Sequence, residues 1–123
     1  MPDATEEVRY VVLSHGGVPE PHFDLMFETD PGGMLLTWRT LVWPITEETA
    51  LVRLGEHRRD YLDYEGPLTD GRGYVNRIAG GNCTVTWTTR HDFTLRLADR
   101  NTLRLQHLDD DHWLATPQAE RQS

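Results

Sequence analysis

The alternation that decides the fold lies in His22-Phe23-Asp24-Leu25-Met26-Phe27-Glu28. In a β-strand, successive side chains point to opposite faces, so His22, Asp24, Met26 and Glu28 share one face. The two phenylalanines and the leucine share the other face, which suits a hydrophobic core. This stretch therefore predicts a strand that packs on one side and presents a row of candidate ligands on the other.

His15, His22 and Asp24 are candidate ligands for a divalent cation. The segment between the two histidines, GGVPEP at 16–21, is rich in glycine and proline and predicts a loop between two strands. This loop brings His15 toward His22 and Asp24, and two imidazoles with one carboxylate leave coordination positions open for a substrate. A His-x-Asp pair is also common on a solvated strand face, so a metal-free barrel is the competing interpretation.

Strand-like runs separated by turn signals continue through the rest of the chain. Their spacing of about 8–12 residues is typical of a sandwich or a barrel. Gly80-Gly81-Asn82 predicts a turn between two of the runs, and Asp109-Asp110-Asp111 predicts another. The predicted strands are 8–14, 22–28, 34–40, 74–78, 84–89, 93–97, 102–108 and 112–116.

The segment 46–63 is ambiguous. Thr46 is suited to capping a helix, but residues 51–54 followed by Gly55 favour a short strand slightly. One helical turn after them would place His57 and Tyr61 on the same face at four-residue spacing. The fold we predict is all-β: a small, partly open antiparallel β-barrel with one or two short helical turns.

Length and composition predict one domain, 1–123, with a core from about residue 8 to residue 117. The net charge of −8 argues against a broad nucleic-acid surface, although a small contact with one strand end remains compatible with it. No apolar run approaches the roughly 18–20 residues that cross a bilayer, and the N-terminus is acidic. With Cys83 as the only cysteine, we expect a cytoplasmic monomer without disulfides or membrane contact.

A second set of residues has the order and spacing of a known family. His57 precedes Tyr61 by four positions, and Tyr64-Glu65-Gly66 follows. Together with His15, the 22–28 stretch and Thr37-Trp38, these residues resemble the phosphoesterase domain of the bacterial end-joining DNA ligase D, which also occurs as a stand-alone protein. The resemblance runs from about residue 10 to residue 85, with a looser match beyond.

The resemblance implies a manganese-dependent hydrolase, with zinc as the alternative metal, that acts in DNA repair. It would trim the 3′ end of DNA, or of DNA with a terminal ribonucleotide, by removing a ribonucleoside and then a phosphate. Carried over residue by residue, His15, His22 and Asp24 hold the metal, and His57 and Tyr61 contact the scissile phosphate. A divalent ion polarises a phosphoryl oxygen and an imidazole exchanges a proton with the leaving group. A repair protein of non-homologous end joining is the implied protein partner.

Two departures from the family weaken the expected phosphate contact. Met26 stands where the family has an arginine, and a thioether supplies no charge to a phosphate. The lysine that follows the family's Trp-containing strand is also missing, because all 12 basic residues are arginines. Losing one preorganised donor typically costs about a hundredfold or more in rate. Candidate replacements are Arg39, Arg58, Arg59 and Arg72. The alternative function is a catalytically weak metal-binding module that recognises a phosphate end or a protein partner.

Three other features have simpler explanations. The acidic and histidine-rich segment 107–112 is typical of a charged hairpin turn. The four tryptophans are suited to stacking on bases, but in a small β-protein they favour core packing. Glu65 either orients a ligand from behind or only ties down its turn.

Overall fold

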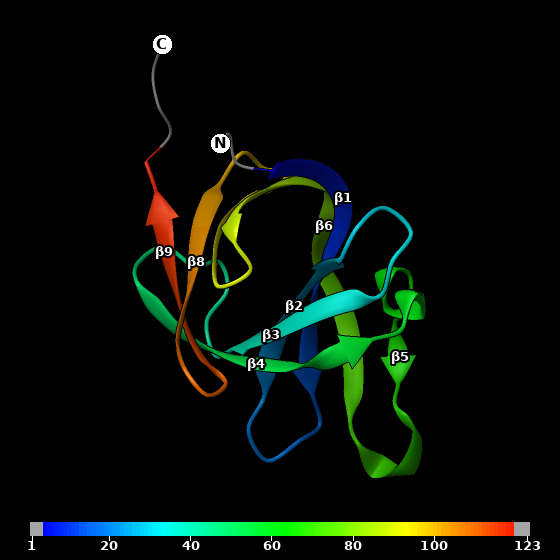
Figure 1. Cartoon of the computed structure of the whole chain (residues 1–123). Coiled ribbons are helices and arrows are strands. Elements are labelled where there is room, and N and C mark those ends of the chain that lie inside the picture. Colours follow the sequence, from blue (N-terminus) through cyan, green and yellow to red (C-terminus); the bar gives the residue numbers. More distant parts are fainter. Residues whose placement is uncertain (1–3, 120–123) are drawn as a thin grey trace.

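Nine antiparallel strands and two 3₁₀ turns make up residues 4–119, the part of the chain that the computed structural model describes (Figure 1). The sheet order is β1-β2-β3-β4-β9-β8-β7-β6-β5, and β1 also pairs with β6, which closes eight strands into a barrel. The prediction of an all-β antiparallel barrel with one or two short helical turns is confirmed, and the barrel is closed where a partly open one was expected. The elements are β1 (Ala4–Gly16), β2 (His22–Glu28), β3 (Leu35–Thr40), β4 (Thr49–His57), η1 (Arg59–Leu62), β5 (Gly66–Pro67), η2 (Thr69–Gly71), β6 (Tyr74–Thr89), β7 (Asp92–Arg96), β8 (Thr102–Asp109) and β9 (His112–Gln118).

The barrel closes along the long pairing between β1 and β6, which curve together in Figure 1. The predicted turn at Gly80-Gly81-Asn82 is wrong, because these residues continue β6 and pair with Val11, Tyr10 and Arg9 of β1. Gly81 has a φ of +137°, a backbone conformation that only glycine adopts without strain. The glycines therefore let one strand of 16 residues bend around the barrel, where the sequence pattern suggested two strands.

The ambiguous segment contains both of the elements considered for it. Residues 49–57 form β4, which confirms the preference for a strand. A helical turn follows, but η1 begins at Arg59, so His57 ends the strand and does not belong to the turn. Within residues 4–119, no helix is long and apolar enough to cross a membrane.

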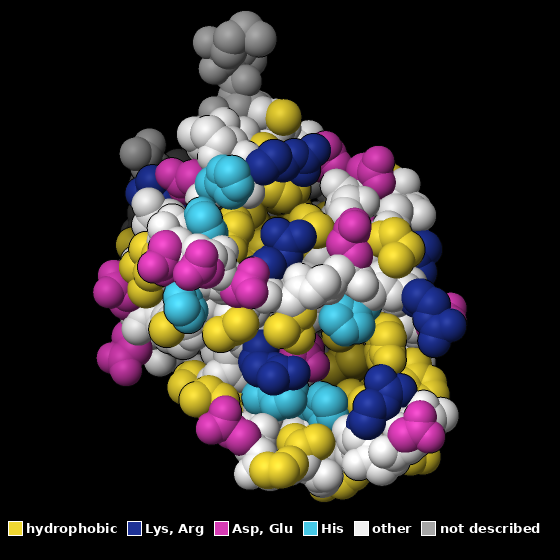
Figure 2. All heavy atoms as spheres, turned by 60° about the horizontal axis from the view of Figure 1, so that its bottom comes forward, with side chains coloured by type: hydrophobic (Ala, Val, Ile, Leu, Met, Phe, Trp, Pro, Cys, Tyr) yellow, Lys and Arg dark blue, Asp and Glu magenta, His cyan; other side chains and the backbone are white. Residues whose placement is uncertain are grey.

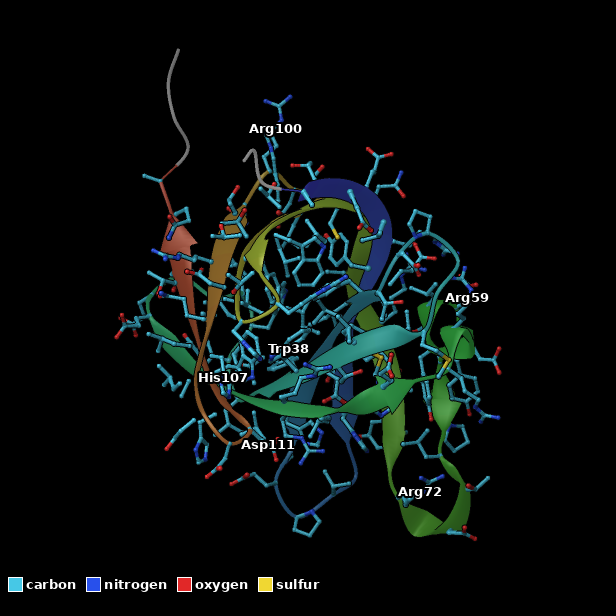
Figure 3. All side chains as sticks on the ribbon, viewed as in Figure 1. Trp38, Arg59, Arg72, Arg100, His107 and Asp111 are labelled. Atoms are coloured by element: carbon cyan, nitrogen blue, oxygen red, sulfur yellow. The ribbon has the colours of Figure 1, made fainter. Side chains whose placement is uncertain are left out.

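The barrel interior is a dense aromatic core. Trp38 is fully buried there, as Figure 3 shows, and stacks on Phe27 with 5.2 Å between ring centroids. Trp113 meets Trp38 edge to face at 5.3 Å. Three of the four tryptophans (Trp38, Trp87 and Trp113) are buried, which confirms core packing for them.

A second, smaller core lies on the outer face of the sheet. Residues of β1 and β2 alternate between the two cores, so Tyr10 and Phe27 face the interior while Val11 and Met26 face outward. The chain between β4 and β6 covers this outer cluster through Leu62 of η1, with Tyr61 and Leu68 packed against it. The outer cluster comprises Val11, Leu13, Met26, Leu35, Leu62 and Val75. Both faces of β2 are therefore buried.

Candidate metal centre

The register of β1 against β2 brings the predicted ligands together. His15 lies opposite His22, and Leu13 lies opposite Asp24, so all three candidate ligands share the outer face of the sheet. His22 and Asp24 are each only 6% exposed. A solvated polar row, the competing interpretation from the sequence, is therefore wrong for these two residues.

The three side chains form a compact cluster with the dimensions of a metal site. One ligand atom from each of His15, His22 and Asp24 lies within 4.8 Å of the other two. Asp24 Oδ2 is 3.7 Å from His15 Nδ1 and 3.6 Å from His22 Nε2. Metal–ligand bonds of about 2.1 Å at ordinary angles place neighbouring donor atoms about 3.0–3.4 Å apart. Small side-chain movements would therefore bring these donor atoms to coordination distance.

Backbone carbonyls fix the tautomers of both histidines. A carbonyl oxygen only accepts, so His22 donates its Nδ1–H to the carbonyl of Glu20 at 3.0 Å. In the same way His15 donates its Nε2–H to the carbonyl of Arg72 at 2.8 Å. In the neutral tautomers that these bonds select, the lone pairs lie on His15 Nδ1 and His22 Nε2, the two nitrogens nearest Asp24. This is the arrangement in which a histidine ligand is oriented by a hydrogen bond from its other nitrogen.

Two atoms of the cluster are buried without a hydrogen-bond partner among the described residues. They are His22 Nε2 and Asp24 Oδ1. A buried lone pair and a buried carboxylate oxygen are costly unless a donor or a cation satisfies them. The donor set of two imidazole nitrogens and a carboxylate therefore fits a metal ion. Elsewhere among residues 4–119, no other group of three such side chains converges.

A cavity of about 250 Å³ opens beside the cluster and includes the other predicted site residues. On the face of the molecule drawn in Figure 2, histidine and arginine side chains gather around a hollow in the lower half of the picture. His57 and Tyr61 both line the cavity, together with His15 and Asp24. The structure thus brings four of the five predicted site residues to one cavity. The fifth, His22, is not in the lining, but its Nε2 lies 3.6 Å from Oδ2 of Asp24, which is. The complete lining is Leu13, His15, Asp24, Met26, Arg39, Leu54, His57, Tyr61, Leu68, Arg72 and Val75.

His57 and Tyr61 meet although they do not share a helical face. His57 Nδ1 lies 2.9 Å from the carbonyl of Gly55 and 2.8 Å from Thr37 Oγ1. The carbonyl requires a proton on Nδ1, which leaves Nε2 of a neutral ring as an acceptor. Tyr61 packs edge to face on this imidazole, with ring centroids 5.6 Å apart. His57 ends β4 and Tyr61 lies in η1, so the short step from the strand into the 3₁₀ turn brings the two rings into contact.

Met26 belongs to the apolar floor of the cavity. It is 2% exposed and packs among the residues of the outer cluster. Two of the four candidate replacements for the missing cation, Arg39 and Arg72, line the cavity itself. Arg58 lines the neighbouring pocket, and Arg59 is bound to Glu28.

The ion pair that anchors η1, between Glu28 and Arg59, was not predicted from the sequence. Glu28, 4% exposed, accepts hydrogen bonds from the backbone N–H of Arg9 at 2.6 Å and of Gly32 at 2.8 Å, and from the Arg59 guanidinium. Burial alone would raise the pKa of Glu28, but the bonds from Arg59, Arg9 and Gly32 outweigh it and lower that pKa. The alternation in β2 placed Glu28 on the ligand face, but no local pattern indicates a partner 31 residues away.

Other polar features of the sequence lie apart from the cavity. His107 binds the carbonyl of Asp110 at 2.8 Å, and His112 lies 3.2 Å from Asp109, so segment 107–112 forms a charged hairpin as expected. Figure 3 shows His107 and Asp111 beside β8 and β9. Glu65 is exposed and accepts the backbone N–H of Arg77 at 3.1 Å, which favours a role in its turn.

No protein-family model matches this chain, and no curated protein matches it in sequence.

Proposed function

We propose that this protein is a metal-dependent phosphoesterase that acts on the 3′ ends of nucleic acids. One observation carries the proposal: the cluster of His15, His22 and Asp24 borders, through His15 and Asp24, the same cavity that His57, Tyr61 and two arginines line. The resemblance to the ligase D phosphoesterase domain also supports it, because His57 and Tyr61, to which the resemblance assigns the phosphate, line this cavity. Manganese as the metal and end joining as the pathway are parts of this proposal that rest on the resemblance.

Each side chain has a defined task in the proposed reaction. His15, His22 and Asp24 would hold the ion, which would supply Lewis-acid chemistry toward a phosphoryl oxygen. His57, with its Nδ1 proton held by Gly55, uses Nε2 to exchange a proton with an ester oxygen. The Tyr61 hydroxyl donates a neutral hydrogen bond to a non-bridging oxygen. The buried apolar floor around Met26 keeps bulk water from one side of the phosphate.

A second pocket continues the cavity and favours a polymer end over a free phosphate. It has a volume of about 280 Å³ and shares Tyr61, Leu68 and Arg72 with the cavity. Arg58 and the ring of Tyr64 add a cation and an aromatic face, and the two tyrosine rings meet edge to face at 6.3 Å. Arginine and aromatic faces are suited to phosphates and stacked bases of a single strand. The lining holds two arginines and one carboxylate, Asp60, and this small positive excess agrees with contact to one strand end in a protein of net charge −8.

The test uses the manganese-loaded protein on primer–templates that end in a ribonucleotide or a 3′-phosphate. We expect shortened or dephosphorylated products from the natural protein, and at least a hundredfold less from Asp24→Asn and His57→Ala. His107→Ala serves as the matched control, because this histidine lies outside the cavity and should leave the rate unchanged. Product formation that His57→Ala and Asp24→Asn leave intact would assign the activity to a contaminant and refute the proposal.

The position of Met26 favours a second candidate, a binding module with weak or no catalysis. Its thioether is buried among Val11, Leu13 and Leu35 and offers no charge to a phosphate. If the natural protein binds a 3′-phosphate end without turnover, and Met26→Arg then hydrolyses it, the binding module is the correct assignment. Rapid hydrolysis by the natural protein would eliminate that assignment.

A further inference from the structure

We propose that Arg39 is the phosphate-binding cation of this cavity and that the same charge weakens metal binding until a phosphate arrives. This inference rests on the proposed function and adds a coupling between its two ligands. It assigns to β3 the charge that Met26 does not supply on β2.

The register places Arg39 directly beside the candidate metal ligands. Arg39 of β3 pairs with Asp24 of β2, so its side chain lies on the same outer face. Its Nε is 3.9 Å from Asp24 Oδ1, which is too long for a hydrogen bond. The same Nε is buried and has no hydrogen-bond partner among the described residues. Arg39 therefore holds a positive charge at the cavity with donors still available to an anion.

Two neighbouring arginines, Arg59 and Arg72, already have some of their donors engaged elsewhere. Arg59 binds Glu28 and the carbonyl of Gly33. Arg72 donates from Nε and Nη2 to the carbonyl and hydroxyl of Thr69, at 3.0 and 2.8 Å. Arg72 lies at the lower right of Figure 3, and its own backbone carbonyl accepts the hydrogen bond that orients His15. Arg39 is thus the cavity-lining arginine whose guanidinium is best placed to bind a phosphate beside Asp24.

The coupling follows from the shared carboxylate. The two histidines lie at Oδ2 of Asp24 and Arg39 lies at Oδ1, so a bound divalent ion and the guanidinium would be like charges on one carboxylate. Like charges at such separations repel strongly in a partly buried site. A dianionic phosphate between them neutralises both, so each ligand should tighten the binding of the other, as linkage requires.

The experiment measures both ligands on the natural protein, Arg39→Gln and a matched control. Arg104→Gln is the control, because Arg104 is also about half exposed (44% against 42%) and also lies beside an aspartate, but on β8. Free Mn²⁺ is followed by electron paramagnetic resonance, and adenosine 3′-monophosphate is titrated calorimetrically into manganese-loaded protein. For Arg39→Gln we expect phosphate affinity to fall at least tenfold while Mn²⁺ affinity without phosphate rises about threefold or more.

The opposite signs separate this role from a structural one. Arg39→Lys keeps the positive charge, so its Mn²⁺ affinity should stay as low as that of the natural protein. It lacks the planar guanidinium that binds a phosphate with two parallel donors, so part of the phosphate affinity should be lost. If Arg39→Gln lowers both affinities, or changes neither while the natural protein binds both ligands, the inference fails and the proposed function stands. If the natural protein binds neither Mn²⁺ nor the nucleotide, both the inference and the proposed function fail.

Discussion

Replacing Glu28 by glutamine should destabilise the barrel and loosen the turn that carries Tyr61. Glu28 is 4% exposed, and its carboxylate accepts N–H groups from Arg9 and Gly32 as well as from the guanidinium of Arg59, the first residue of η1. Glutamine has the same shape but only one accepting oxygen. Its NH₂ group would take the position of the second carboxylate oxygen, where it would point at an N–H donor that it cannot accept from. Arg59 would also lose its counter-charge.

The magnitude follows from the number and the kind of bonds. Each hydrogen bond to a charged group contributes about 1.5–3 kcal/mol, and glutamine keeps part of this set. Because the Arg59 side chain is 39% exposed, solvent screens its share of the loss. We expect a net loss of about 2–3 kcal/mol in the free energy of unfolding, which corresponds to a fall in Tm of roughly 10 °C for a domain of this size.

The direction of the pKa shift of Glu28 determines how the stability of the folded protein changes with pH. The folded-state pKa of Glu28 is lowered from its ordinary value of 4.5, so the unfolded chain takes up this proton first as pH falls. The stabilisation is therefore complete above the ordinary value and is lost as pH falls through the folded-state pKa. The difference between the natural protein and Glu28→Gln should be constant near neutral pH and should shrink in acid.

Denaturant unfolding followed by circular dichroism measures the effect at pH values on both sides of this range. Glu65→Gln is the matched control, since exposed Glu65 accepts one backbone N–H and should change stability by less than about 0.5 kcal/mol. A Glu28→Gln loss no larger than the control's at neutral pH, or a difference that grows in acid, would refute this account of the anchor.

Three further predictions concern stability and access. Cys83 is 2% exposed and burial raises its pKa to about 12, so Ellman's reagent should react with it only in the unfolded protein. Without metal, Asp24→Asn should be as stable as the natural protein, or about 1 kcal/mol more stable, because the buried carboxylate that it replaces has only long ion pairs. Adding Mn²⁺ should then leave the Tm of this variant unchanged in thermal unfolding. Gly73→Ala should lower the free energy of unfolding by about 2 kcal/mol or more, because φ is +87° and a Cβ would lie 2.2 Å from the carbonyl oxygen of Gly16. A Cβ at Gly55 would meet nothing within 4 Å, so the control Gly55→Ala should be neutral or slightly stabilising in the same denaturant assay.

The strands were predictable where alternation and turn residues agreed. Residues 22–28 form β2 with the expected bounds, because both faces of this strand bury distinct side chains. The failure at Gly80-Gly81-Asn82 has a physical cause: the same glycines permit either a turn or a bend within a strand. Only the pairing with β1, some 70 residues earlier in the chain, decides between these conformations. Closure of the barrel depends on that same long-range pairing.

The candidate site was predictable to the extent that its residues are organised by short spacing or by family resemblance. His15, His22 and Asp24 come together through one hairpin, so a local pattern was sufficient. Glu28 and Arg59 meet only through the packing of distant segments. Arg39 lies beside Asp24 only because of the register between β2 and β3. Such pairings leave no periodic trace in the sequence, which is why Arg39 was only one of four candidate cations.

The two cores explain how a stable barrel can also carry a costly polar cluster. The aromatic interior around Trp38 packs independently of the outer face, so its burial of apolar surface is not reduced by the charges outside. The outer cluster around Met26 then forms an apolar floor next to Asp24, which lowers the local dielectric and strengthens interactions with a bound ion or anion. An arginine at position 26 would bring charge into that floor, whereas Arg39 reaches the same carboxylate from the rim with a side chain that is 42% exposed. A cation at the rim keeps its hydration on one side, so the second core remains intact while the cavity gains its positive charge.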